Sequence, residues 1–340
     1  MVTIKDVARD AGVSVGTVSN VLNGGRVSEA RRKLVEASIE KLGYQVNTLG
    51  MRMQKTDYVV VILPNLINPY FALLLDALES ELSAVGKQVL LCLSGDDAER
   101  EVAFMDMAKQ NKVDGIIGVT YSKVEEERIE NMAFVSIDRH YKSHIPCVAG
   151  DNWQGGWLAA ENLHKRGSTN LLCFMTMSSV DSEVRKRRVG FTEYCMEHDL
   201  SCNSVEMSEK QIVSVYESYG SRKLIHNMLR AYISPSLGEH SIDGIFTSSD
   251  HLATIVREEL EEMGKRVPED IQIIGYDGLQ FLNQGKPIVS SIAQPVHEIA
   301  KQAVKSLTDM IENGKAEDVT NIPVTFHEGP TTKPLETISE

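Results

Sequence analysis

The sequence lacks the features that mark several broad classes of protein. Its 340 residues contain no apolar stretch long enough to cross a bilayer, and the start, MVTIKDVARD, has no apolar signal-peptide core. We therefore expect a cytoplasmic protein. The five cysteines, Cys92, Cys147, Cys173, Cys195 and Cys202, include no C-x-x-C pair. Core thiols are favoured over a zinc site or a disulfide framework.

Signatures of catalysis are also missing. No G-x-G-x-x-G turn and no G-x-x-x-x-G-K-[ST] loop follows any predicted strand, so nucleotide chemistry has no support. The nine histidines are scattered, and no Ser-His-Asp or metal-ligand spacing emerges. We expect neither a metal nor another cofactor, and we do not expect an enzyme.

Charge is distributed unevenly along the chain. The net charge is −13, which by itself argues against a nucleic-acid partner. Residues 1–56 nevertheless carry nine Lys/Arg against five Asp/Glu, a net of +4, which leaves −17 for the remainder. A small basic head on a large acidic body suits a protein that touches phosphate at one end only.

The first segment predicts two short helices joined by a tight turn. Thr3 is a good N-cap and Asp6 can complete a capping box. One apolar helix face follows, formed by Ile4, Val7, Ala8 and Ala11. Gly12 ends that helix and Ser14 caps the next, a spacing typical of a helix-turn-helix.

A third helix, from about Ser28 to Lys41, is expected to pack Val35, Ile39 and Leu42 against the first two. The alternative is an ordinary three-helix cap on a larger domain.

The second helix of a helix-turn-helix enters the major groove with its first residues near base edges. The short hydroxyl residues Ser14, Thr17 and Ser19 suit phosphate contacts. Candidate base readers are Val15, Gly16 and Asn20, because Asn pairs with adenine and Val can touch a thymine methyl. For Val15 a place in the core is the alternative, since it lies three residues before Val18.

The pattern changes from Tyr58 onward. Apolar runs of strand length occur at 59–64, 89–93, 115–119, 134–137, 170–175, 242–247 and 271–276. Helical segments such as 99–111 separate them. This βαβα rhythm predicts parallel sheets covered by helices, in two sets.

Polar residues follow several of these strands. Asp138-Arg139, Asp250 and Asp277 come after three of them, and Asn68-Pro69-Tyr70-Phe71 comes after the first. Ligands of doubly wound lobes bind outside the carboxyl ends of the strands. Carboxylates and amides can take the paired hydroxyls of a sugar, whereas an isolated strand-end Asp is more often a cap or turn residue.

The N-terminal segment resembles the LacI/GalR family of bacterial transcription regulators. The family pattern T-I-x-D-V-A-x-x-A-G-V-S-x-x-T-V-S-x-V-L-N is matched at 3–23, and V-S-E-x-x-R-x-x-V-x-x-A-I-x-x-L-G-Y is matched at 27–44 except at Ser38. The resemblance implies a lambda-repressor-like, all-α helix-turn-helix domain that binds double-stranded operator DNA. The expected DNA contacts are Thr3, Ser14, Val15, Gly16, Thr17, Ser19, Asn20, Asn23, Arg31, Asn47 and Met53.

In that family a hinge helix reading P-N-x-x-A-R-x-L folds on DNA and inserts a leucine pair into the minor groove. Here the segment reads V-N-T-L-G-M-R-M at 46–53. Gly50 lowers helix propensity by about 1 kcal/mol relative to Ala. Met53 is an apolar side chain that could still kink a base step. Without the resemblance to this family, residues 46–56 would be interpreted as a polar linker.

The body resembles the family's periplasmic-binding-protein-like sensor domain, a two-lobed α/β fold. N-P-[FY]-F stands at 68–71, R-x-x-G-F at 187–191, the V-P-x-D pattern at 267–277 and Q-P at 294–295. The resemblance implies a small effector, with a sugar or sugar derivative preferred. The expected contacts are Tyr70, Phe71, Asp138, Arg139, Arg187, Asp250 and Asp277.

The resemblance also implies a domain plan: a DNA-binding domain at 1–45, a hinge at 46–56, a two-lobed domain at 57–330 and a tail at 331–340. One lobe would hold 57–150 and 284–311, and the other 151–283 and 312–330. The tail has no leucine heptads for tetramerisation, so a homodimer is expected. A repressor controlled by a ligand is the preferred function. A transport-type solute-binding protein and a Rossmann-like enzyme are the alternatives.

Overall fold

The structure is a computed structural model. It describes residues 2–22, 27–43, 56–95, 97–120, 129, 132–141, 145–177, 182–208, 211, 222–233, 241–280 and 285–335. The chain divides into two compact units, residues 1–57 with 110–114, and the rest. We describe the head (residues 1–45) and the body (residues 57–330) separately.

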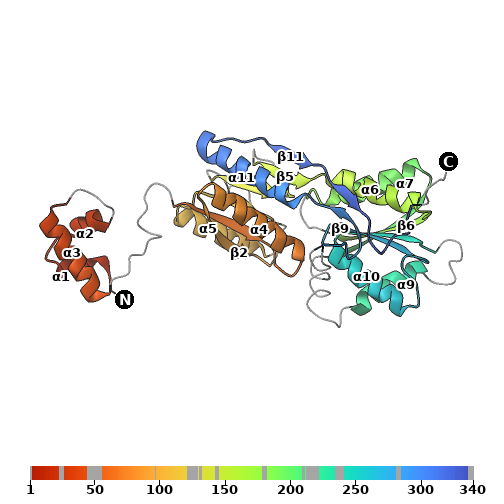
Figure 1. The fold of residues 1–340 in the computed structure, drawn as a ribbon, viewed down its shortest axis with the longest axis horizontal. Coiled ribbons are helices and arrows are strands. Elements are labelled where there is room, and N and C mark those ends of the chain that lie inside the picture. The colour runs from red at the N-terminus through yellow and green to blue at the C-terminus, as the bar shows by residue number, and fades with distance from the viewer. Residues whose placement is uncertain are drawn as a thin grey trace. The chain divides into compact units, whose positions relative to one another are not determined.

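The head is a bundle of three helices, α1 (Ile4–Asp10), α2 (Val15–Leu22) and α3 (Glu29–Leu42), as the sequence predicts (Figure 1). Its core is formed by Val7, Ala8, Val18, Val21 and Val35, with Ile39 and Leu42 packed against it.

Three local features define the helix ends of the head. The Asp6 carboxylate accepts hydrogen bonds from the backbone N–H and the hydroxyl of Thr3, at 3.0 and 2.6 Å. Gly12 turns the chain at a φ of +64°, which a side chain would disfavour. Ser14 Oγ accepts from Thr17 N at 3.1 Å and so caps α2. The capping box and the tight turn expected from the sequence are therefore present.

Ser38, which departs from the family pattern, joins two helices of the head. Its hydroxyl lies 2.8 Å from Asp10 Oδ2 and 3.3 Å from the Val7 carbonyl, both on α1. Lys41 Nζ contacts the other oxygen of Asp10 at 2.7 Å. The substitution therefore adds a polar link between α3 and α1. The hinge prediction falls on residues 46–55, which lie outside the described residues.

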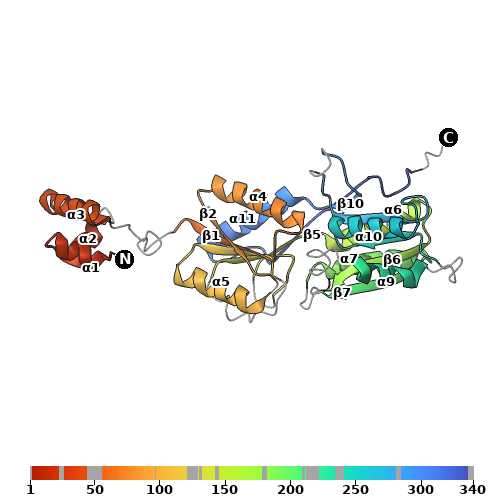
Figure 2. The same ribbon diagram turned by 90° about the horizontal axis from the view of Figure 1, so that it is seen from below.

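The first lobe of the body is built on a parallel sheet in the order β11-β5-β4-β3-β1-β2. Its strands are β1 (Tyr58–Leu63), β2 (Gln88–Leu93), β3 (Gly115–Gly118), β4 (Phe134–Ile137), β5 (Cys147–Gly150) and β11 (Val319–Ile322). Helices α4 (Pro69–Ala84) and α11 (Val296–Asn313) share one apolar core with this sheet. Figure 2 shows α5 (Ala98–Gln110) on the opposite face.

The second lobe has a sheet in the order β12-β10-β9-β8-β6-β7, parallel except for the antiparallel pair β10 and β12. Its strands are β6 (Asn170–Met177), β7 (Ser201–Ser208), β8 (Gly244–Thr247), β9 (Gln272–Asp277), β10 (Ser290–Ala293) and β12 (Thr325–His327). One face packs against α6 (Asn152–Lys165) and α7 (Arg185–Glu197). The other packs against α9 (Arg222–Ile233) and α10 (Asp250–Glu262).

Sheet membership corrects the expected crossings between the lobes. β10 pairs with β9 in the second lobe, although 284–311 was expected in the first. β11 pairs with β5 in the first lobe, although 312–330 was expected in the second. The crossings therefore fall at about 294–295, between β10 and α11, and at 323–324, between β11 and β12. Hydrogen-bonded pairing between distant segments decides this, and the apolar pattern of either strand alone does not.

Within the described ranges, none of the helices is both long and apolar enough to cross a membrane. The predicted fold class, a helix-turn-helix domain followed by a two-lobed α/β domain, is confirmed.

Candidate functional site

A buried polar cluster lies where the carboxyl ends of the strands of both lobes meet. Asp138 follows β4, Asn152 follows β5, Ser248 follows β8, Asp277 ends β9 and Gln294 follows β10. Because parallel strands end at the same edge of a sheet, these residues converge although they are far apart in sequence. We call this set, together with Arg187 and Tyr70, the interlobe cluster.

Arg187, on the first turn of α7, lies at the centre of the cluster. Its Nε donates to Asn152 Oδ1 at 2.6 Å, and one terminal nitrogen donates to the Ser248 carbonyl at 2.8 Å. The guanidinium stacks 3.5 Å from the ring centroid of Tyr276. With only 4% of its surface exposed, Arg187 is a fixed positive charge in a desolvated place.

Asp138 joins the two lobes through its backbone as well as its side chain. Its carbonyl accepts from Ser182 Oγ and from the N–H of Glu183, both at 2.9 Å. Asn152 Nδ2 lies 3.4 Å from its carboxylate. Burial raises the pKa of Asp138, and the charge of Arg187 opposes that rise. Its φ of +60° is a left-handed conformation that is uncommon for a residue with a side chain.

Asp277 faces the cluster from the second lobe. Gln294 Nε2 donates to its Oδ1 at 2.9 Å, and the Asn68 side chain of the first lobe lies near enough to the carboxylate to lower its pKa. Among the described residues, its buried Oδ2 has no hydrogen bond of normal length and angle. Burial raises the pKa of Asp277 to about 7, and the charge of Arg187 limits the rise. Tyr70 reaches the same place from α4, with its hydroxyl 3.4 Å from Gln294 Oε1. A ligand hydroxyl could supply the missing partner of Oδ2.

Arg139 is buried in the first lobe beside the cluster. Its guanidinium donates to Thr120 Oγ1 at 3.2 Å and lies 4.3 Å from the ring centroid of Tyr141. Its backbone forms an isolated bridge with Ser182 of the second lobe. Arg139 is therefore positioned by both lobes, next to Asp138.

Two of the residues expected to contact the effector, Phe71 and Asp250, pack outside the interlobe cluster. The Phe71 ring packs in the core of the first lobe, edge-on to Tyr70 at 5.6 Å between centroids. Asp250 is fully buried at the start of α10, and its Oδ2 accepts from Leu279 N at 2.7 Å. It fixes the turn after β9, which is the cap or turn role that is the commoner one for a strand-end Asp.

Sequence reasoning did not single out Asn152 and Gln294 as site residues. Asn152 contacts Arg187, Asp138 and the Tyr276 hydroxyl, and Gln294 bridges Asp277 and Tyr70. Gln294 directly follows β10 and Asn152 lies two residues after β5, and the apolar runs did not reveal either of these short strands. The Q-P pair at 294–295 is the sequence feature that could have indicated Gln294.

The head presents the expected DNA contacts on its surface to different extents. Ser14, Gly16 and Asn20 are exposed, and Val15 is 42% exposed, so Val15 is not a core residue. Thr17 and Ser19 are partly buried, while Thr3 and Arg31 are exposed. Asn23, Asn47 and Met53 lie outside the described residues. As DNA contacts, all of these residues stay a prediction.

In the part of the chain that the structure describes, no group of three or more His, Cys, Asp or Glu side chains could hold a metal ion.

Two family models match this chain. Residues 3–47 match "Bacterial regulatory proteins, lacI family", and residues 160–332 match "Periplasmic binding protein-like domain". The sucrose operon repressor of Pediococcus pentosaceus is 32% identical over 332 residues, which cover 96% of this chain and 98% of that protein. The ribose operon repressor of Halalkalibacterium halodurans is 32% identical over 316 residues, covering 92% and 91%.

A solved structure from Alkaliphilus metalliredigens, a periplasmic binding protein/LacI transcriptional regulator complexed with D-xylulofuranose, is 26% identical with a TM-score of 0.69. It covers 82% of this chain, and all of that chain is matched. The two family models match residues of the head and of the body, and the family consists of regulatory proteins rather than enzymes. The chain belongs to the lacI family of bacterial regulatory proteins.

Proposed function

We propose that this protein represses transcription of an operon by binding operator DNA through its head, and that a sugar bound at the interlobe cluster changes its affinity for that operator. The cluster is the observation that carries the proposal. It brings the buried charges of Arg187, Asp138 and Asp277 to one place between two lobes. The names of the two sucrose and ribose operon repressors and the sugar in the solved relative support this class of effector.

A sugar matches the chemistry of this site. The desolvated carboxylate of Asp277, with one oxygen lacking a partner, can accept from a hydroxyl, and Arg187 can donate to one. A ligand that bridges Asp138 and Arg139 of the first lobe with Arg187 and Asp277 of the second favours one arrangement of the lobes. By linkage, any ligand that prefers one arrangement of the body also changes operator affinity.

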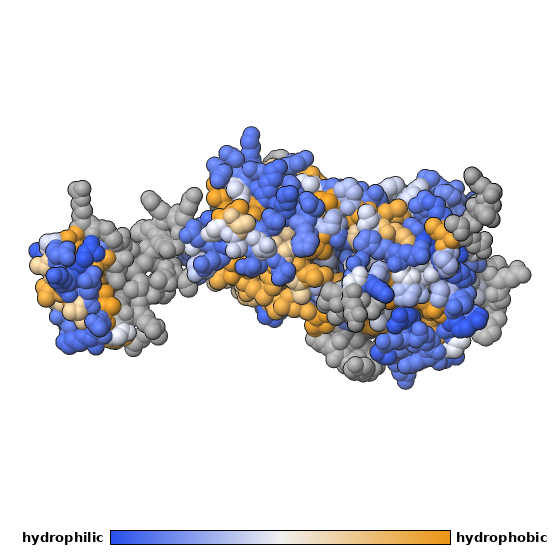
Figure 3. All heavy atoms as spheres, in the orientation of Figure 1, coloured by the Kyte–Doolittle hydropathy of each residue, from blue (hydrophilic) through white to orange (hydrophobic). Residues whose placement is uncertain are grey.

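We propose a homodimer, because a two-fold protein matches two half-sites on DNA. The first lobe offers an apolar surface for such a contact. Three large apolar side chains of this lobe are exposed. They are Leu66 (39%) and Ile67 (43%), which precede α4, and Leu91 (39%), which lies on the edge strand β2. Figure 3 shows apolar residues gathered over part of this lobe. Acting on DNA, the protein would work in the cytoplasm, associated with the nucleoid.

The proposal is tested by titrating the full chain with labelled promoter DNA, with and without sucrose, ribose and related sugars. We expect sequence preference, a steep loss of affinity with salt, and a change of operator affinity on the order of 5–150-fold with the correct sugar. In Arg187→Lys this response is lost while operator binding without sugar is kept, because the planar guanidinium makes two directed bonds that an ammonium cannot copy.

Arg188→Lys is the matched control, since Arg188 points away to Glu206 at 3.2 Å and is half exposed. A full sugar response in Arg187→Lys would exclude the interlobe cluster as the effector site. Equal affinity for all DNA sequences would contradict the recognition of a specific operator.

A further inference from the structure

The segment just before α7 is bound to the segment that follows β4, so the two lobes are joined beside the interlobe cluster. Glu183 N donates to the Asp138 carbonyl at 2.9 Å, and Arg139 forms an isolated bridge with Ser182. These contacts run between the lobes, because β4 belongs to the first sheet and α7 packs on the second. Separation of the lobes would therefore break them.

The side chain of Glu183 makes a second connection across the same boundary. His140 Nε2 lies 2.6 Å from Glu183 Oε1, and Lys186 Nζ lies 2.7 Å from the same oxygen. A carboxylate can only accept, so Nε2 carries the hydrogen of the bond to His140. His140 belongs to the first lobe, whereas Lys186 lies three residues after Glu183 in the second. One carboxylate oxygen thus has a partner in each lobe.

Burial gives the contact across the boundary its importance. The Glu183 side chain is 2% exposed, whereas His140 is partly exposed and Lys186 is exposed. A buried carboxylate loses its hydration and is tolerated where charges and hydrogen bonds replace the lost water. Without His140, the joined lobes would bury Glu183 with one donor fewer, while separated lobes would return it to water. Loss of His140 therefore favours separated lobes.

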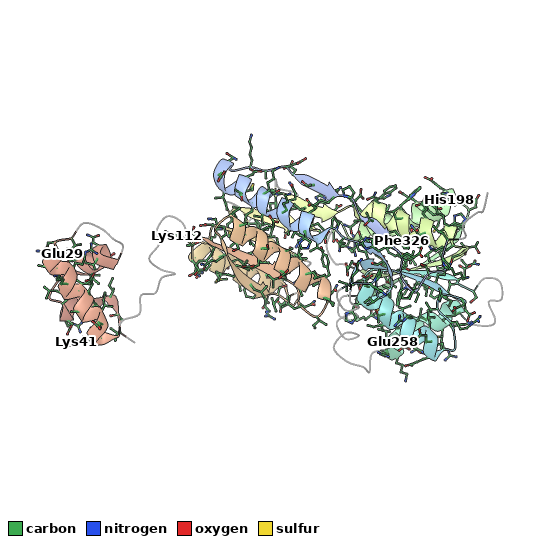
Figure 4. All side chains as sticks on the ribbon, viewed as in Figure 1. Glu29, Lys41, Lys112, His198, Glu258 and Phe326 are labelled. Atoms are coloured by element: carbon green, nitrogen blue, oxygen red, sulfur yellow. The ribbon has the colours of Figure 1, made fainter. Side chains whose placement is uncertain are left out.

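This contact lies at the end of α7 that carries Arg187. Arg187 follows Glu183 by four residues and lies in the first turn of the helix. Figure 4 shows the labelled His198, just after the other end of α7, on the side of the second lobe away from the first. α7 thus runs away from the lobe boundary. Its attachment to the first lobe holds Arg187 close to Asp138, with Asn152 in contact with both.

We propose that His140 and Glu183 form a latch that holds the two lobes together, and that Glu183 is a positioning residue for Arg187 at the effector site. The latch acts in the chain without a ligand, and its effect on sugar affinity rests on the proposed function. A sugar that bridges the lobes binds the joined arrangement, so a latch that favours this arrangement strengthens binding. It does so without touching the sugar.

The test is hydrogen exchange of the sugar-free full chain, with mass spectrometry of overlapping peptides that cover residues 182–187. The Glu183 amide reports on the lobes, because its acceptor is the Asp138 carbonyl on the other lobe. In His140→Leu we expect this amide to exchange about fivefold faster, since the donor to the buried carboxylate is lost. Amides of the second sheet should exchange as in the unchanged protein, which separates lobe opening from unfolding.

Further variants separate the latch from packing and from charge. His140→Gln keeps an N–H donor at a similar reach and should restore most of the protection that His140→Leu loses. Lys186→Gln is the matched control, because it removes the partner of the same Glu183 oxygen that lies within the second lobe. Its Glu183 amide should exchange as in the unchanged protein. His140→Ala carries the same expectation as His140→Leu, so the result does not depend on one variant folding.

Sugar affinity is the second measurement. Calorimetry with ribose and sucrose should show binding about two- to fivefold weaker in His140→Leu, for whichever sugar binds the unchanged protein, because a smaller fraction of the chain has joined lobes. Lys186→Gln should keep the affinity of the unchanged protein. Unchanged or tighter binding by His140→Leu would overturn the positioning role of Glu183.

The exchange measurement decides the latch by itself. Unchanged exchange of the Glu183 amide in His140→Leu would overturn it, and so would an equally large loss of protection in Lys186→Gln. Because exchange is measured without sugar, a protein that binds none of the sugars would contradict the proposed function and not the latch.

Discussion

At the scale of single residues, Asp277 combines two unfavourable properties. Its φ is +115°, a backbone conformation that L-residues rarely adopt, and its carboxylate is desolvated beside the buried Asp250. Strain and buried charge of this kind persist where the surrounding fold fixes them, and they concentrate at functional sites. We infer that Asp277 keeps this unfavourable conformation and environment because it binds the ligand. One of its carboxylate oxygens makes no hydrogen bond within the described residues.

This cost predicts how stability depends on pH. In the unfolded chain an Asp ionises near pH 4, whereas burial raises the pKa of Asp277 to about 7 in the folded protein. Between these values the unfolded chain has lost the proton that the folded chain keeps, so stability falls as pH rises. The destabilisation caused by burying the Asp277 charge is therefore absent below about pH 4 and complete above about pH 7.

We therefore expect Asp277→Asn to raise the free energy of unfolding at pH 8 by about 2–4 kcal/mol, and by less at pH 5. The same change weakens the sugar response, because the acceptor is lost. Denaturant unfolding at both pH values measures the stability. Asp76→Asn, at an exposed position of α4, is the control and should show neither effect. Equal gains at the two pH values would contradict the assignment.

Ser38 gives a second prediction at this scale. Replacing Ser38 by Ala removes its hydrogen bond to Asp10 and should destabilise the head by about 1 kcal/mol. Amides of α1 and α3 should then exchange hydrogen about fivefold faster in the intact protein. Lys33→Ala, at an exposed position of α3, is the control. Unchanged exchange would show that this polar link contributes nothing measurable.

At the scale of elements, α6 and α7 pack with their backbones in contact. A Cβ on Gly156 would lie 1.8 Å from the Arg187 carbonyl oxygen, and one on Gly190 would lie 2.0 Å from that of Trp153. Only glycine permits this approach, because both obstacles are backbone atoms. The approach also sets the position of Arg187, which lies on the contacting face of α7.

Gly190→Ala should therefore separate the two helices. We expect it to lower the free energy of unfolding by about 2–3 kcal/mol and to reduce the sugar response by moving Arg187. Gly16→Ala is the matched control for stability, because its nearest neighbour would be Ser14 Oγ at 3.8 Å. Denaturant unfolding of both variants makes the comparison. A Gly190→Ala protein as stable as the unchanged one would contradict the close packing.

At the scale of the whole molecule, the charge division separates two tasks. The net +4 of residues 1–56 and the −17 of the remainder predict that phosphate is touched at one end only. Removing residues 1–56 should abolish operator binding while the body keeps its sugar affinity, because the interlobe cluster draws on the body alone. Titration with operator DNA tests the loss of DNA binding, and calorimetry with sugar tests whether the sugar affinity is kept. Sequence-selective DNA binding by the shortened protein would overturn this division.

The sequence by itself determined the parts that depend on local order. Thr3, Gly12 and Ser14 set the ends of α1 and the start of α2, and short apolar runs set the central strands of both sheets. These signals lie within a few residues of the structure they produce, so their periodicity and capping chemistry can be read directly.

Only the tertiary structure decided what distant segments do together. It moved the lobe crossings to 294–295 and 323–324, added Asn152 and Gln294 to the interlobe cluster, and gave Asp250 a place supporting the turn after β9. The physical reason is common to all three: strand pairing and burial depend on partners remote in sequence, whose identity no local pattern contains.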